Sequence, residues 1–313
     1  MEKPKLAIRS SEVLTPEDLI GAARTPGTKR KYSAMWEKFD GFCQENQCVS
    51  VPANEETVLG FLADLCNRGQ GKAGKAMLTV IRERHLLEGK KDPTRTRKVM
   101  LATEGALRLS ANDKVWPQER EPFGIEAIKH WVKTKPGSSN FVQARDAAIV
   151  ALGFRAMLRP GELAKMKLAD WKDLKEKVYL RIGRSKADQR AERKPIVLEV
   201  VNSDICPVKL TREYLVWRAI KGFAEKEQLF VSEKGGNMST AGISSVVKKV
   251  AKAAGLEGKY SGHSLRIGGA SASLEGGLSK DQIKAVGGWK SEAVDKYLRS
   301  FRAGDRVAHA MGF

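Results

Sequence analysis

Three side chains in the last fifth of the sequence have types that could act together on a phosphate. His263 and Arg266 are three residues apart, so a helix would place them on one face, and Tyr297 follows farther along the chain. A guanidinium matches phosphate geometry, an imidazole titrates near neutral pH, and a phenolic hydroxyl can attack phosphorus. The set suits phosphoryl transfer, whereas ordinary helix packing is the alternative for each residue alone.

Three more residues extend this set in the second half of the chain. Arg159 lies in "MLRPGEL", Lys186 in "GRSKADQR", and Trp289 directly follows two glycines. Pro160 disfavours a helical conformation at Arg159 and suits the first position of a new helix, which predicts Arg159 at a helix start. Such an arginine usually faces solvent or a carboxylate, and a turn lysine is usually only solubilising. The ordered occurrence of the whole set indicates a site.

The elements around these residues are predicted to be mostly helical. Apolar periodicity predicts helices over 125–132 and 140–157, a helix carrying Ile243, Val246, Val247 and Val250, and helical segments with glycine breaks to the end. The stretch "KVYLRIGRSKADQRAERKPIVLEVV" reads as strand, turn and strand, with Lys186 in the turn, and "QLFVSE" as a further strand. We expect Tyr297 in a helix with Val294, Leu298 and Phe301.

The first third of the chain is predicted to be all-helical. Apolar stripes predict helices over 28–45, after a capping Asn54, over 73–87 and over 97–109. The polar stretch "SANDKVWPQEREPF" holds two prolines and predicts a linker. We therefore expect a helical domain over 1–111, a linker over 112–122 and a second domain over 123–313. The fold class is mainly α with a small antiparallel β-sheet.

The amino-acid composition narrows the classes of molecule that the protein could bind. The 313 residues include 56 Lys and Arg against 37 Asp and Glu, a net charge of +19 that favours a nucleic acid over a merely solvated surface. The four cysteines, Cys43, Cys48, Cys66 and Cys206, lack zinc spacing and fit a reducing, intracellular setting. No nucleotide loop or metal-ligand spacing is present, so we expect no cofactor and no metal.

Several segments together resemble the tyrosine recombinase (phage integrase) family. The segments "MLRPGELAKMKLADW", "SGHSLRIGGAS" and "VGGWKSEAVDKYLRS" look like the two arginine boxes and the nucleophile segment, and "TKRKYSAMWEKFDGFCQEN" looks like the first helix of the core-binding domain. The wording of the last two boxes is most similar to recombinases of eukaryotic DIRS-type and crypton-like mobile elements. Two features differ from the pattern of many family members. Trp289 stands where histidine is common, and Tyr297 follows Trp289 by eight residues, where many bacterial members have one residue more.

The resemblance implies a role for each residue. Tyr297 would be the nucleophile that forms a 3′-phosphotyrosine, and Arg159 and Arg266 would hold the phosphate. His263 would bind the phosphate and take the tyrosine proton, Lys186 would protonate the leaving 5′ oxygen, and Trp289 would donate its indole N–H. Glu162 would support Arg159 or His263. The residues expected to contact DNA elsewhere are Arg82, Arg95, Arg97 and Arg184.

The resemblance also implies the partners: duplex DNA, and other copies of the chain as a dimer on one site and a tetramer in synapsis. A type IB topoisomerase and a DNA-binding derivative that cuts nothing remain alternatives. We expect an intracellular protein, nuclear if it comes from a eukaryotic mobile element.

Overall fold

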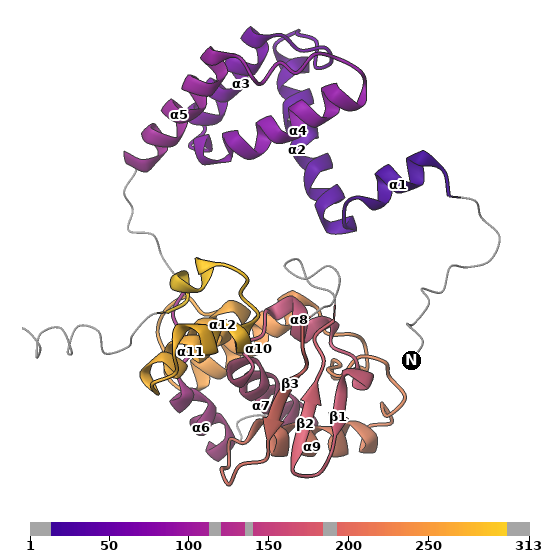
Figure 1. The fold of residues 1–313 in the computed structure, drawn as a ribbon, viewed down its shortest axis with the longest axis vertical. Coiled ribbons are helices and arrows are strands. Elements are labelled where there is room, and N and C mark those ends of the chain that lie inside the picture. The colour runs from indigo at the N-terminus through magenta and orange to yellow at the C-terminus, as the bar shows by residue number, and fades with distance from the viewer. Residues whose placement is uncertain (1–13, 113–119, 135–139, 184–192, 299–313) are drawn as a thin grey trace, which may run out of the picture. The chain divides into compact units, whose positions relative to one another are not determined.

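The computed structural model describes residues 14–112, 120–134, 140–183 and 193–298. The chain divides into two compact units, residues 1–117 and 118–313, whose helices and strands are labelled in Figure 1. The division falls inside the stretch expected to be a linker. Lys186 and Arg184 lie outside the described residues.

The regular elements of the first unit, within its described residues, are all helices. Its elements are α1 (Pro16–Ala22), α2 (Pro26–Glu45), α3 (Glu55–Asn67), the 3-10 turn η1 (Gly71–Ala73), α4 (Gly74–Leu87) and α5 (Arg97–Asn112). The Asn54 side chain caps α3 by accepting a hydrogen bond from Thr57 N at 2.8 Å, as the sequence predicts. The core contains Phe39, Phe61 and Ile81.

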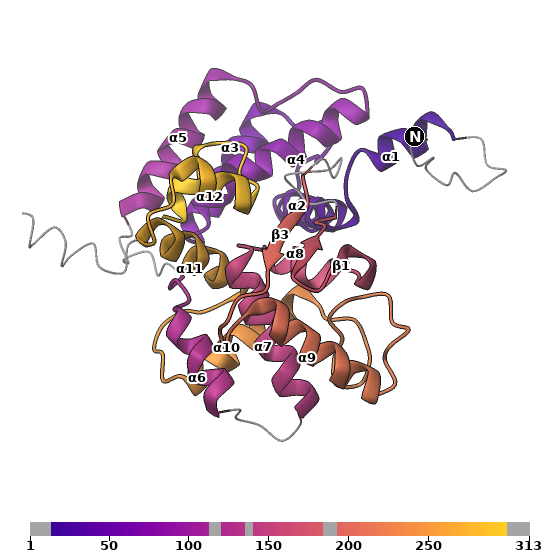
Figure 2. The same ribbon diagram turned by 60° about the horizontal axis from the view of Figure 1, so that its bottom comes forward.

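The second unit is built around helix α7 (Asn140–Arg155), which is buried along most of its length. It packs against α6 (Ile125–Thr134), α9 (Pro207–Ile220), α10 (Thr240–Ala253) and α11 (Gly262–Glu275), as Figure 2 shows. The shorter elements are α8 (Pro160–Lys165), α12 (Lys280–Gly287) and the 3-10 turns η2 (Leu168–Asp170) and η3 (Glu292–Lys296). None of the described helices has an apolar stretch long enough to span a bilayer.

A three-stranded antiparallel sheet lies against this helical core. Its strands are β1 (Trp171–Asp173), β2 (Lys177–Leu180) and β3 (Ile196–Glu199), in the spatial order β1-β2-β3. Val178 pairs with Leu198, and both are fully buried. The predicted fold class, mainly α with a small antiparallel sheet, is confirmed.

The prediction of a strand over "QLFVSE" is wrong. Leu229, Phe230 and Val231 are buried, but this segment forms only isolated bridges. The Tyr214 hydroxyl donates to Leu229 O and accepts from Val231 N, both at 3.1 Å. A buried backbone must find hydrogen-bond partners, and here a tyrosine side chain supplies two of them in place of a neighbouring strand.

The local structure at Tyr297 also differs from the prediction. Tyr297 follows the 3-10 turn η3, and its N–H donates to Val294 O at 2.7 Å. The predicted α-helix around it is therefore not present in the described residues up to Leu298. Strand β1, which has three residues, was missed by the sequence reasoning because it is too short to show a period.

Candidate active site

Arg159 stands at the start of α8, in extended backbone geometry, with Pro160 as the first helical residue. Glu162 holds it at two points. One carboxylate oxygen accepts from Arg159 Nη1 at 2.8 Å and the other from Arg159 N at 2.7 Å. The Glu162 side chain is 5% exposed and that of Arg159 is 27% exposed, so the carboxylate fixes a guanidinium that still reaches the surface.

Arg266 is a fully buried cation on α11. Its Nη1 donates to the backbone oxygens of Met157 and Gly287, the latter at 2.9 Å. Nε and Nη2 find no hydrogen-bond partner in the part of the chain that the structure describes. Burial, followed by the charge of Arg159, lowers the pKa of Arg266 to about 9, so the guanidinium stays charged at neutral pH. Such a cation is costly unless an anion joins it.

Trp289 and Tyr297 lie directly beside this cation. The Arg266 guanidinium carbon is 3.6 Å from the centre of the Trp289 ring and 5.4 Å from that of Tyr297. The two aromatic rings are 5.2 Å apart, and the Trp289 indole nitrogen has no partner among the described residues. Tyr297 is half-buried, and Ser271 Oγ donates to its backbone oxygen at 3.2 Å. The Tyr297 ring therefore lies beside a buried positive charge.

His263 lies on α11 one turn before Arg266 and is half-buried. Burial lowers the pKa of its imidazole below the usual 6.5, and the charges of Arg120, Arg266 and Arg159 lower it further. Glu162 opposes this shift. The imidazole is therefore neutral at neutral pH and can accept a proton.

Two glycines explain how the local sequence brings these side chains together. A Cβ on Gly262 would come within 2.6 Å of Pro160, so only glycine lets the start of α11 approach the start of α8. Gly288 ends α12 in the left-handed conformation at φ 67°, directly before Trp289. The close approach and the turn thus bring Arg159, Arg266 and Trp289 close together.

The structure brings together six of the residues that the sequence singles out: Arg159, Glu162, His263, Arg266, Trp289 and Tyr297. Sequence reasoning missed two neighbours of this set, Arg120 beside His263 and Arg193 beside Gly288. Neither belongs to a spaced motif, so only the tertiary structure identifies them.

The first unit carries three of the residues expected to contact DNA, Arg82, Arg95 and Arg97. Arg82 Nε and Arg95 Nε lie 3.2 and 3.5 Å from the same oxygen of Asp92, and both side chains remain well exposed. Arg97 is the first residue of α5. An arginine pair shared with one carboxylate keeps a net positive charge on this surface.

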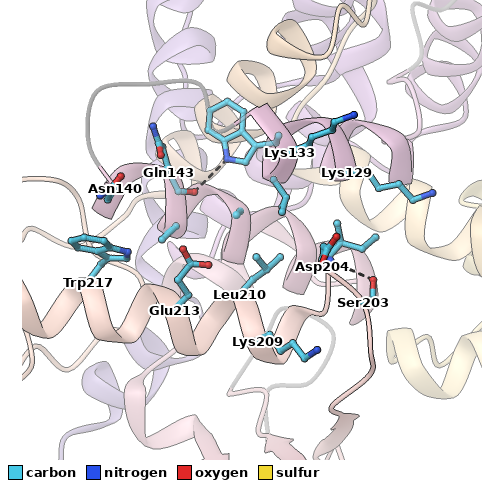
Figure 3. A pocket seen from close by; sticks show the side chains of 15 residues that line it. Lys129, Lys133, Asn140, Gln143, Ser203, Asp204, Lys209, Leu210, Glu213 and Trp217 are labelled. Atoms are coloured by element: carbon cyan, nitrogen blue, oxygen red, sulfur yellow. Dashed lines mark hydrogen bonds between the residues drawn. The ribbon is translucent and has the colours of Figure 1, made fainter.

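A cavity of about 840 Å³ lies elsewhere in the second unit, between α6, α7 and α9 (Figure 3). Trp217 and Leu210 line one side, and Lys129 and Lys133 line another. None of the predicted catalytic residues lines it. Among the described residues, no group of His, Cys, Asp and Glu could hold a metal ion.

Comparison with known proteins identifies the family. The profile of the Phage integrase family matches residues 123–303. An "Integrase/recombinase xerD homolog" of Selenomonas ruminantium is 24% identical over 291 residues, which cover 88% of this chain and 82% of the relative. The tyrosine recombinase XerC of Caldanaerobacter subterraneus is 35% identical over 123 residues, covering 39% of this chain and 31% of that protein.

Solved structures share the fold. A lambda integrase tetramer bound to a Holliday junction superposes with a TM-score of 0.59 at 14% identity, covering 92% of this chain and 75% of that chain. The XerH site-specific recombinase in a post-cleavage complex superposes with a TM-score of 0.58 at 18% identity, covering 83% of this chain and 72% of that chain. The family match over residues 123–303, together with the clustered arginines, histidine and tyrosine, establishes that this chain belongs to the phage integrase family of tyrosine recombinases, which cleave and rejoin DNA through a tyrosine intermediate.

Proposed function

We propose that the chain is a site-specific DNA recombinase in which Tyr297 cuts DNA. The observation that carries the assignment of Tyr297 is its ring lying 5.4 Å from the Arg266 guanidinium, two of whose nitrogens have no partner among the described residues. A phosphodiester bound at this site would satisfy those nitrogens and meet the phenol.

The reaction is a transesterification. The Tyr297 oxygen forms a bond to phosphorus while the bond from phosphorus to the 5′ oxygen breaks. The phenolic proton passes to His263, which is neutral because of burial and its cationic neighbours. The 5′ oxygen takes a proton from Lys186, a role carried by the family resemblance, and a free 5′-hydroxyl results.

The two arginines stabilise the charge that builds on the nonbridging oxygens. Arg266 offers Nε and Nη2 from a buried position, and Arg159 offers the nitrogens that Glu162 does not bind. Each well-placed donor of this kind contributes about 3 kcal/mol to the transition state. Trp289 adds a buried indole N–H where histidine is common in the family.

The substrate is duplex DNA, and the chain acts as several copies. Related structures hold a lambda integrase dimer on a core site and a tetramer on a Holliday junction. A net charge of +19 would attract DNA and release counterions when phosphates bind. In this proposal residues 1–111 form the core-binding domain, and Arg82, Arg95, Arg97 and Arg184 contact DNA outside the active site.

The experiment uses a duplex with a nick near the cut site, from which the leaving fragment diffuses away. Wild-type protein should accumulate a covalent adduct with the DNA, while Tyr297→Phe should bind equally well and form none. A normal adduct from Tyr297→Phe would overturn the choice of nucleophile. Exchange of strands between two DNA molecules distinguishes a recombinase from an enzyme that only relaxes supercoils.

We further propose that the chain comes from a eukaryotic mobile element, in which case it acts in the nucleus. The wording of "SGHSLRIGGAS" and "VGGWKSEAVDKYLRS" supports this origin. The test is the genomic neighbourhood: repeated element ends in a eukaryotic genome are expected, and a bacterial chromosome around the coding sequence would contradict the proposal.

A further inference from the structure

Arg193, three residues before β3, contacts the end of α12 from a distant part of the chain. Its Nη2 donates to the backbone oxygen of Val286. A Cβ added to Gly288 would lie 2.9 Å from Arg193 Nε and 3.0 Å from its Cζ. The Arg193 guanidinium therefore lies against the turn formed by residues 286–289.

Two guanidinium groups bind successive carbonyls at this helix end. Arg193 takes Val286 O, and Arg266 takes Gly287 O at 2.9 Å. The last carbonyls of a helix lack intrahelical partners and carry partial negative charge, so cations stabilise them. Arg266 is held partly by this turn, and Arg193 holds the same turn from another side.

Trp289 is the next residue after the turn, and its position depends on the geometry of the turn. Its backbone N–H donates to Lys284 O at 3.0 Å, which closes the end of α12. A Cβ on Gly287 would come within 1.7 Å of the Trp289 ring, so the ring lies tightly against the turn. A small shift of the turn would therefore move the indole relative to the Arg266 guanidinium that it covers.

We propose that Arg193 is a positioning residue for the cleavage reaction: it fixes the Val286–Trp289 turn and thereby holds Trp289 against Arg266. The inference rests on the proposed function for its catalytic consequence, but its structural part stands on the contacts of Arg193, Gly288 and Trp289. The charge of Arg193 also lies close to Arg266, because it adds to the lowering of the pKa of Arg266 that burial and Arg159 cause.

Two other possible roles of Arg193 lead to different predictions. If Arg193 only capped α12, its removal would lower stability without moving Trp289. If Arg193 bound a DNA phosphate, its removal would weaken binding and reduce the salt dependence of binding by about one phosphate contact. A positioning role instead lowers the cleavage rate through Trp289 and leaves DNA affinity nearly unchanged.

The first test needs no DNA. The full chain, labelled with ¹⁵N at its tryptophan indoles, is compared as wild type, Arg193→Ala, Arg193→Lys and Lys194→Ala, with the Trp289 signal assigned by its loss in Trp289→Phe. Lys194 is the exposed neighbour, so Lys194→Ala removes the same charge one residue away. The Trp289 signal should move in Arg193→Ala, stay close to wild type in Arg193→Lys, which keeps a donor, and not move in Lys194→Ala. An unmoved signal in Arg193→Ala overturns the inference.

The second test measures adduct formation with all DNA bound. Arg193→Ala should slow cleavage about tenfold while changing Kd by less than about threefold, and Lys194→Ala should change neither. In a Trp289→Ala background, Arg193→Ala should slow cleavage by no more than about twofold further. An equal loss of cleavage rate in the wild-type and Trp289→Ala backgrounds would contradict a role through Trp289. A loss of DNA affinity with an unchanged cleavage rate would contradict it as well. Absence of any adduct from the wild type would instead refute the proposed function, and the indole signal would still decide the placement of Arg193.

Discussion

The guanidinium of Arg266 lies over the indole ring of Trp289, with its central carbon 3.6 Å from the ring centre and both side chains buried. A cation over an aromatic face gains electrostatic attraction that grows when water is excluded. The family resemblance places Trp289 where many members have histidine, which offers a hydrogen-bond donor. Tryptophan offers a hydrogen-bond donor and also a large aromatic face, so it can hold the Arg266 guanidinium in place before a phosphate binds.

Arg266→Lys should abolish most of the cleavage while leaving binding largely intact. Lysine keeps the charge but loses the planar fork that contacts Met157 O, Gly287 O and a phosphate together. The expected loss in single-turnover cleavage is about 100-fold or more, with Kd changed by less than about threefold. Arg181→Lys, at an exposed arginine paired with Asp170, is the matched control. Equal losses in both variants would contradict this account.

Glu162→Gln should slow cleavage by releasing Arg159. The carboxylate binds both the backbone and the guanidinium of Arg159, and an amide keeps one acceptor oxygen but no charge. We expect a loss of about tenfold in the cleavage rate, measured as adduct formation at saturating DNA. Glu126→Gln removes an exposed carboxylate that pairs with Lys129 and should have no effect. An unchanged rate in Glu162→Gln would show that Arg159 needs no such support.

The pH dependence of cleavage should reflect the lowered pKa of His263. Burial lowers this pKa first, Arg120, Arg266 and Arg159 lower it further, and Glu162 opposes them. The neutral imidazole is the active form, so the rate should stay high at pH 6.5 and fall only in more acidic solution. Adduct formation at subsaturating DNA reports the free protein and is the quantity to measure. An acid limb centred at or above pH 6.5, or the same limb in His263→Gln, contradicts the assignment.

Gly287→Ala should displace the Trp289 ring from its position beside Arg266. The added methyl would overlap the Trp289 ring, which must then leave its position beside Arg266. We expect a loss of about 1–3 kcal/mol in the free energy of unfolding of the second unit and slower cleavage. Gly41→Ala in α2 meets no atom within 4 Å and should be neutral or stabilising by about 0.5–1 kcal/mol. Chemical denaturation of both variants makes the comparison, and a neutral Gly287→Ala would contradict the packing described.

Much of the site could be predicted from the sequence because its residues occur in short local patterns. Arg159 precedes a proline, His263 and Arg266 share a helix face, and Trp289 follows two glycines. Each pattern fixes a local conformation, and together they match the boxes of one family.

Other features depend on contacts between distant segments. Arg193 and Val286 are 93 residues apart, and no period or spacing in the sequence connects them. The segment over "QLFVSE" has the composition of a strand. The side chains of Tyr214 and Arg218, however, form hydrogen bonds with its backbone groups in place of a neighbouring strand. Tyr297 follows a 3-10 turn, which begins after Ser291, whose side chain accepts a hydrogen bond from Ala293 N.

The central claim is that Tyr297 becomes joined to the 3′ end of the cut DNA strand. The most direct measurement is mass spectrometry of the peptide that remains bound to DNA after a nicked substrate is cleaved and the adduct is digested. The account predicts a single modified peptide, with the nucleotide on the Tyr297 oxygen through a 3′-phosphate. A nucleotide on any other residue, or a link through a 5′-phosphate, would contradict it.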